Sequence, residues 1–189
     1  DNNRSRGLGD VYKRQSMSAM KKWAKNTQRN HIIVEHNDDS GSVDEQAYIK
    51  KLTSDVRVVS IVHTSPVTGM TVDLEKITKE VRNVTPDCII IVDGIQHSSH
   101  GAIDVQKYDI DGYVVSPYKM FSRHGYGVAW ASDRLCTLNK EQLADGPFQN
   151  WELGTRDAGS YATFSDVVDY LDWLGSNFTE SENTRERLE

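Results

Sequence analysis

Cysteine and long apolar runs are both scarce in this sequence. Only Cys88 and Cys136 occur among 189 residues, so the chain has no disulfide framework and no CxxC pair, a pattern typical of a reducing, cytoplasmic setting. No apolar run approaches the roughly 18 residues of a membrane span, and no charged segment followed by an apolar one opens the chain as a signal peptide would. We therefore expect a soluble, cytoplasmic protein with no membrane partner.

An excess of basic residues is missing as well. The chain has 22 Lys and Arg against 28 Asp and Glu, a net charge of −6, and its basic residues are scattered. This distribution argues against binding to nucleic acid and favours a small molecule or a protein as the partner. A hydrophobic content of 37% over this length is enough for one globular domain with a core, but not for a second full domain.

Both ends of the chain differ in composition from its middle. Residues 1–15 have few apolar residues and no periodicity, and "GLGDVYKRQ" resembles translated adapter sequence, so we predict a disordered or non-native tail there. Residues 16–180 form the predicted domain. Residues 181–189 are polar and read as the start of a helix that stops early.

Between these ends, helical and strand patterns alternate. Asp73 can cap a helix that Thr85-Pro86 stops, and Ser42 with Glu45 forms a capping box for an earlier one. The last helix starts near Ser160. Its apolar stripe, together with Tyr170 and Trp173, is expected to pack against the protein. The other predicted elements are a helix over 17–26 and strands over 31–35, 56–62, 88–92, 112–116 and 127–132.

The strands are continuous β-branched runs rather than alternating ones, which predicts burial on both faces beneath two layers of helices. The gap between the strands at 112–116 and 127–132 is too short for a crossover helix, so the last strand should run antiparallel to its neighbour. The sequence therefore predicts a three-layer αβα fold with a mostly parallel sheet.

Two charged residues follow strands of this sheet. Asp93 comes directly after an apolar run, and Lys119 lies three residues beyond the end of the next. Many strands end in a solvated charge, which accounts for either residue alone. Because ligands of parallel sheets bind beyond the carboxyl ends of the strands, the two together indicate a shared site if their strands are neighbours.

Four motifs around these residues resemble the class V aminotransferases, and within that superfamily the cysteine desulfurase and selenocysteine lyase group. The family pattern has an Asp-Gly-x-Gln stretch, a Ser-x-His-Lys stretch, a glycine-rich turn into an antiparallel strand, and a Gly-Thr pair. In this chain they read "DGIQ" at 93–96, "SPYK" at 116–119, "GYG" at 125–127 and "GT" at 154–155. Residues 16–180 would then be part of the large domain of a fold-type I enzyme that depends on pyridoxal 5′-phosphate (PLP).

The resemblance implies a role for each matched residue. Asp93 would face the pyridine nitrogen of PLP and keep it protonated, because a buried carboxylate favours the charged ring. Gln96 would donate to the phenolic oxygen of the ring. Lys119 would form the internal Schiff base and later shuttle a proton at the substrate Cα. Ser116 and the phenol of Tyr118 would bind the cofactor phosphate.

The same resemblance has implications for other positions. Thr155 would reach the phosphate of a neighbouring subunit, which implies a homodimer. Tyr118 replaces the histidine usual in desulfurases, and Pro66 replaces an asparagine near the ring. The substrate would be an amino acid, and desulfuration, transamination and racemisation all stay open.

Two rival interpretations come from the same residues. "HSSH" at 97–100 places two imidazoles three apart, but no third ligand has a suitable spacing, so we predict no metal and read these histidines, with His124, as polar loop residues near a phosphate site. SxxK is also the nucleophile motif of penicillin-binding proteins. Here a proline follows Ser116 directly, and no SDN or KTG occurs.

Against the family, the chain lacks an N-terminal portion and the small C-terminal domain that supplies the substrate-carboxylate arginine. The isolated chain could therefore be a non-catalytic structural fragment. The strand at 31–35 would lose its pairing partner, so we expect it at an orphaned edge or displaced.

Overall fold

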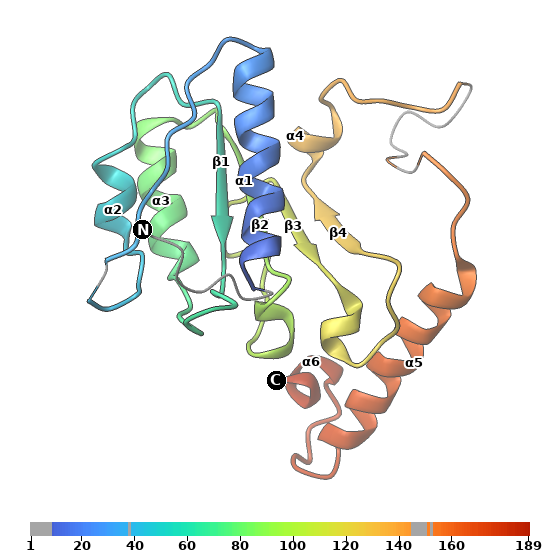
Figure 1. The fold of residues 1–189 in the computed structure, drawn as a ribbon. Coiled ribbons are helices and arrows are strands. Elements are labelled where there is room, and N and C mark those ends of the chain that lie inside the picture. Colours follow the sequence, from blue (N-terminus) through green and yellow to red (C-terminus); the bar gives the residue numbers. More distant parts are fainter. Residues whose placement is uncertain (1–8, 38, 145–150, 152) are drawn as a thin grey trace.

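A four-stranded sheet forms the centre of the protein. The computed structural model describes residues 9–37, 39–144, 151 and 153–189 (Figure 1). The strands lie in the order β1 (Val58–Val62), β2 (Ile89–Asp93), β3 (Gly112–Val115) and β4 (Val128–Ala131). β1, β2 and β3 are parallel, and β4 pairs antiparallel with β3. The predicted mostly parallel sheet and its reversed last strand are confirmed.

One face of the sheet carries the core. Two helices lie over it, α2 (Glu45–Ile49) and α3 (Leu74–Val84), and Asp73 caps α3 by accepting a hydrogen bond from the Lys76 amide, as predicted. The cap of α2 is Asp44 and not the predicted Ser42. The buried apolar residues of this core are Tyr48, Val59, Ile61, Leu74, Ile77, Val81, Cys88, Ile90, Val92, Ile110 and Tyr113.

The opposite face of the sheet is less covered than predicted. Burial alternates along β1 and β2, where residues of the core face are buried, while Ser60 is exposed and Ile91 is half-buried. Helix α1 (Gly9–Asn26) lies on this second side, since the Ser16 hydroxyl bonds to Asp93, a residue that shares the face of Ile91. The αβα layering is confirmed, but the strands are not fully buried on both faces.

The predicted strand at 31–35 does not form. Residues 31–37 have neither helix nor strand, and Ile32 and Ile33 are each 48% exposed. β1 is an edge strand of the described sheet, and this segment does not pair with it. A strand is stabilised by hydrogen bonds to a neighbouring strand, and this segment does not pair with β1. Its apolar, β-branched composition was therefore not enough to make it a strand.

The α1 backbone starts at Gly9, inside the segment predicted to be a tail, and residues 1–8 lie outside the described residues. At the other end, α6 (Thr184–Leu188) follows within residues 181–189. The domain boundaries themselves stay predictions.

Helix α5 (Ala158–Gly175) lies beside β4 at the lower right of Figure 1. The Ser122 and Thr163 hydroxyls hydrogen-bond at 3.2 Å, which ties α5 to the loop before β4, while α6 packs on its other end. Tyr170 is 54% exposed and Trp173 is 60% exposed, so the predicted packing of these two rings is wrong. The apolar stripe of α5 is only half-buried in the described chain.

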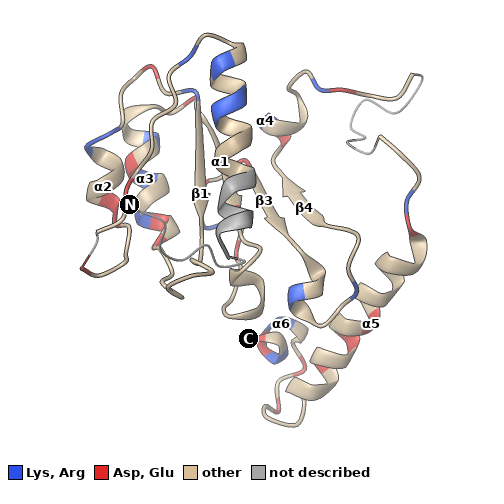
Figure 2. Ribbon diagram, in the orientation of Figure 1, with Lys and Arg blue, Asp and Glu red and all other residues tan. Residues whose placement is uncertain are grey.

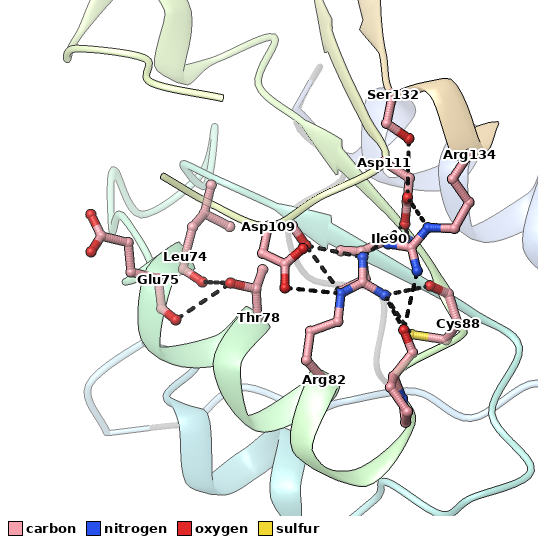
Figure 3. Close-up of polar contacts among 11 residues, drawn as sticks. Leu74, Glu75, Thr78, Arg82, Cys88, Ile90, Asp109, Asp111, Ser132 and Arg134 are labelled. Atoms are coloured by element: carbon pink, nitrogen blue, oxygen red, sulfur yellow. Dashed lines mark hydrogen bonds and ion pairs between the residues drawn. The ribbon is translucent and has the colours of Figure 1, made fainter. Parts of the chain in front are cut away.

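A buried ion network closes the edge of the sheet where β2 and β3 begin (Figure 3). Asp111 is fully buried and accepts hydrogen bonds from Arg82 at 2.9 Å, from Arg134 at 2.7 Å and from the Ile90 amide at 2.8 Å. Ser132 donates at 3.1 Å. Burial alone would raise the pKa of Asp111, but these bonds outweigh it and hold the pKa below its usual value. This network is an anchor between α3, β3 and the start of α4 (Asp133–Cys136).

Lys and Arg residues are spread over α1, α3, the loops and α6 rather than gathered on one face (Figure 2). Asp and Glu residues follow α5 in the same view. Within the described ranges, no helix is long and apolar enough to cross a membrane.

Candidate functional site

Asp93, Gln96 and Lys119 line one pocket at the carboxyl ends of the parallel strands, together with Val62, Thr64, Pro66 and Ile95. Asp93 ends β2 and is paired in register with Val62 of β1 and with Val114 of β3. Gln96 precedes a short 3-10 helix, η1 (His97–Ser99), and Lys119 lies in a second one, η2 (Pro117–Met120), which contacts η1. The structure thus brings together the two residues that the sequence placed beyond adjacent strands.

The Asp93 carboxylate is half-buried, and burial raises its pKa. Hydrogen bonds oppose this shift: the Ile95 amide donates at 3.1 Å, and the Ser16 hydroxyl donates from α1. The negative charge is therefore held by two neutral donors, and desolvation still dominates. A carboxylate in this condition gains from a cationic partner in the pocket.

Lys119 approaches the pocket from the other loop. Its amide donates to the Ser116 carbonyl at 2.9 Å, which closes the turn after β3, and its ammonium lies 5.5 Å from the centre of the Tyr118 ring. Two residues further on, Phe121 has a left-handed backbone with φ of 67°. This conformation is uncommon for a non-glycine residue and ends the 3-10 turn that presents the lysine.

The predicted phosphate ligands lie outside the pocket lining. Ser116 precedes η2 and is half-buried, and Tyr118 stacks on His124 with 4.3 Å between ring centres. Thr155 is exposed and does not line the pocket either. Because Ser116 leads into a 3-10 helix of four residues and not into an α-helix, the SxxK interpretation gains no support.

The histidines are not arranged around a metal. His97 is buried and stacks on His63 with 3.5 Å between ring centres, whereas His100 is exposed and bonds to Ser99 and to the Gln96 carbonyl. No group of three ligating side chains occurs in the part of the chain that the structure describes. His97 was predicted to be a polar loop residue, and its burial corrects that interpretation.

Three features of the site had no clear signal in the sequence. Ser16 reaches Asp93 from a helix far away in the chain. Thr64 lines the pocket two residues after the end predicted for its strand. Gly94 has room for no side chain, because an added Cβ would overlap the ring and hydroxyl of Tyr113. The "DG" dipeptide pointed to Gly94 as part of a motif, but not to this contact.

Comparison with known proteins identifies the family to which these features belong. The sequence profile described as Aminotransferase class-V matches residues 11–185. The chain belongs to this family. Among its curated members, a cysteine desulfurase from Wigglesworthia glossinidia brevipalpis is 34% identical over 96 residues, which cover 51% of this chain and 23% of that protein. A probable cysteine desulfurase from Mycoplasma genitalium is 32% identical over 89 residues, covering 47% and 22%.

Solved structures of cysteine desulfurases share the fold. The cysteine desulfurase CsdA from Escherichia coli matches with a TM-score of 0.69 and 22% identity over 88% of this chain and 43% of that one. This likeness shows the fold. The chain spans less than half the length of these relatives.

Class V aminotransferases depend on PLP, and the pocket fits that cofactor in its chemistry. Three functional groups line one small space, and each suits one part of PLP. The Lys119 amine suits the aldehyde, the Asp93 carboxylate suits the pyridine nitrogen, and the Gln96 carboxamide suits the phenolic oxygen. The desolvated Asp93 is suited to a protonated ring nitrogen, because each charge stabilises the other.

Proposed function

We propose that this chain is the PLP-holding part of an enzyme that acts on the Cα of an amino acid, as cysteine desulfurases do. One observation carries the proposal: Asp93 at the end of β2 and Lys119 in the turn after the adjacent β3 line the same pocket. A charge that ends a strand in solvent would account for either residue alone. It would not explain why both line one pocket, or why burial raises the pKa of Asp93.

Bound PLP supplies an electron sink for the bonds at the substrate Cα. Asp93 holds the proton at the ring nitrogen, and Gln96 orients the ring by donating to its phenolic oxygen. Lys119 holds the cofactor through its amine and afterwards moves a proton at the substrate Cα. Ser116 and Tyr118 are assigned to the phosphate.

Thr155 is assigned to the phosphate of a second subunit. Its exposure and its absence from this chain's own pocket support that assignment. The assembly would be a homodimer with sites shared between subunits, and the reaction at Cα could be desulfuration, transamination or racemisation.

Labelling of the lysine tests the proposal. The protein is mixed with PLP, reduced with borohydride to fix the cofactor to the amine that carries it, digested and analysed by mass spectrometry. The label is expected on Lys119 and is expected to vanish in Lys119→Ala, together with the visible absorbance of the bound cofactor. Lys107→Ala, which removes an exposed lysine outside the pocket, is the matched control.

Two outcomes would contradict the proposal. One is a label spread over several lysines that survives Lys119→Ala. The other is the same PLP affinity in Asp93→Asn as in the unaltered protein, since the variant keeps the size of the side chain but loses its charge.

A further inference from the structure

A chain of hydrogen-bonded polar side chains, all buried except Thr71, begins at Thr64 in the pocket lining. His97 Nδ1 and the Thr64 hydroxyl are 2.8 Å apart, and the Thr64 hydroxyl is also 2.8 Å from that of Thr71. His97 Nε2 lies 3.2 Å from the Ala102 carbonyl. The stacked His63 ring bonds in turn to the Tyr113 hydroxyl at 2.8 Å.

The bond of His97 to the Ala102 carbonyl determines which atom donates and which accepts in each of the other hydrogen bonds. A carbonyl oxygen only accepts, so His97 Nε2 carries a proton and donates to Ala102. In the neutral ring Nδ1 is then the acceptor, and the Thr64 hydroxyl donates to it. Thr64 in turn accepts from Thr71. One tautomer of His97 satisfies every bond.

The ring stays neutral for two reasons. Burial lowers the pKa of His97, and charge repulsion with His100 lowers it as well, so that together they outweigh the bond to the Ala102 carbonyl, which raises it. The groups that face the stacked pair are the hydroxyls of Thr64 and Tyr113, the Ala102 carbonyl and the edge of the Tyr108 ring. None of these is charged at neutral pH, so a proton added to either imidazole would gain no counter-ion there.

The bonds of His97 join two different pocket walls. Thr64 belongs to the loop after β1 and lines the pocket, and the loop after β2 carries Gln96, which also lines it. The latter loop wraps round the imidazole closely enough that a Cβ on Gly101 would overlap the ring. His97 therefore fills the space between these loops and bonds to both.

We infer that His97 is a positioning residue, which fixes Gln96 and Thr64 as opposite walls of the cofactor pocket through its stacking on His63 and its bonds to Thr64 and Ala102. The inference rests on the proposed function for the identity of the ligand. The clamp itself rests only on the contacts of the described residues.

Hydrogen exchange and PLP affinity test the inference together. In His97→Ala the amides of residues 94–102 are expected to exchange faster without PLP, while those of β2 keep their protection. The dissociation constant for PLP is expected to rise roughly tenfold, which is a typical effect of losing a residue that orients the groups in direct contact with a ligand. His97→Gln can donate to Ala102 and accept from Thr64, so it should restore much of the affinity.

Gln106→Ala is the control, because that side chain is exposed and belongs to the same loop but lies outside residues 94–102. If His97→Ala does not fold, Thr64→Val removes the same bond from the other side and should loosen the same segment. If His97→Ala folds, adding Thr64→Val to it should loosen the segment little further, because the two residues share one bond.

Unchanged exchange over residues 94–102 in both His97→Ala and Thr64→Val would overturn the clamp, whatever the protein binds. Faster exchange with unchanged PLP affinity would overturn the positioning role. If the unaltered protein takes up no PLP at Lys119, the proposed function fails, and the exchange data still decide whether the clamp exists.

Discussion

Removal of the Arg82 charge should destabilise the protein more than removal of the charge of an exposed Lys or Arg. The Arg82 side chain is 11% exposed and Asp111 is fully buried, so Arg82→Met leaves a desolvated carboxylate with one cationic partner instead of two. Arg82 also donates to the carbonyls of Cys88 at 2.6 Å and Asp109 at 3.0 Å, bonds that the methionine cannot make. Methionine keeps the apolar stem, so the variant isolates charge and hydrogen bonding.

The size of the effect follows from burial. Removal of one partner of a buried ion pair costs about 3–5 kcal/mol, and the lower figure applies because Arg134 still bonds to Asp111. With a urea dependence of roughly 2 kcal/mol per molar, a loss of about 3 kcal/mol lowers the unfolding midpoint by about 1.5 M. Urea titrations followed by circular dichroism measure this shift.

Lys76→Met is the matched control. It removes a cation from the same helix, but the pair of Lys76 with Asp73 is exposed on both sides and contributes little. The dependence on pH gives a second test. Because the pKa of Asp111 is lowered in the folded protein, its ionised carboxylate stabilises the fold above pH 3.8. This stabilisation is lost as the pH falls through the pKa of the folded state. Equal midpoints for Arg82→Met and Lys76→Met would refute the reasoning.

Two further predictions concern the residues behind the pocket. The pKa of His63 is lowered from 6.5 to about 4, first by burial and then by its stacked neighbour. As the pH falls, His63 is therefore protonated in the unfolded chain before it is protonated in the folded protein. The free energy of unfolding should fall by about 3 kcal/mol as the pH is lowered from 6.5 to about 4, and should level off at lower pH. Urea titrations at several pH values should show a flatter dependence for His63→Gln, and an unaltered slope would count against this origin. Gly94→Ala should cost about 2 kcal/mol in the same assay, since its Cβ overlaps Tyr113, whereas Gly154→Ala, with open space around it, should cost far less.

The strand directions could be predicted from the sequence because they depend on the connections between consecutive strands. β3 and β4 are joined by too few residues for a crossover, and α3 with its Asp73 cap and Thr85-Pro86 stop separates β1 from β2 as a parallel pair requires. The segment at 31–35 has the same apolar composition, but its state depends on a neighbour. Its composition alone could not show whether that neighbour exists, and the same holds for the exposed rings of Tyr170 and Trp173.

The site divides in the same way. Asp93 and Lys119 could be paired from the sequence because strand ends of a parallel sheet meet at one edge. The contact of Ser16 with Asp93, and the stack of His63 on His97, join segments far apart in the chain, and no spacing rule links them. The burial of His97 was missed because a polar loop motif gives no sign of the ring that covers it.

The two edges of the sheet handle buried polarity differently, and the difference supports the assignment of the site. Where β2 and β3 begin, Asp111 has two arginines and a lowered pKa, so its charge is satisfied within the chain. Where β2 ends, the donors that the described part of the chain gives Asp93 are the neutral Ile95 amide and Ser16 hydroxyl, and its pKa is raised. A fold that needed Asp93 only for stability would gain by pairing it in the same manner. Its unneutralised charge is instead what a cationic ring in the pocket requires, because the free energy withheld by desolvation becomes available when the ring binds.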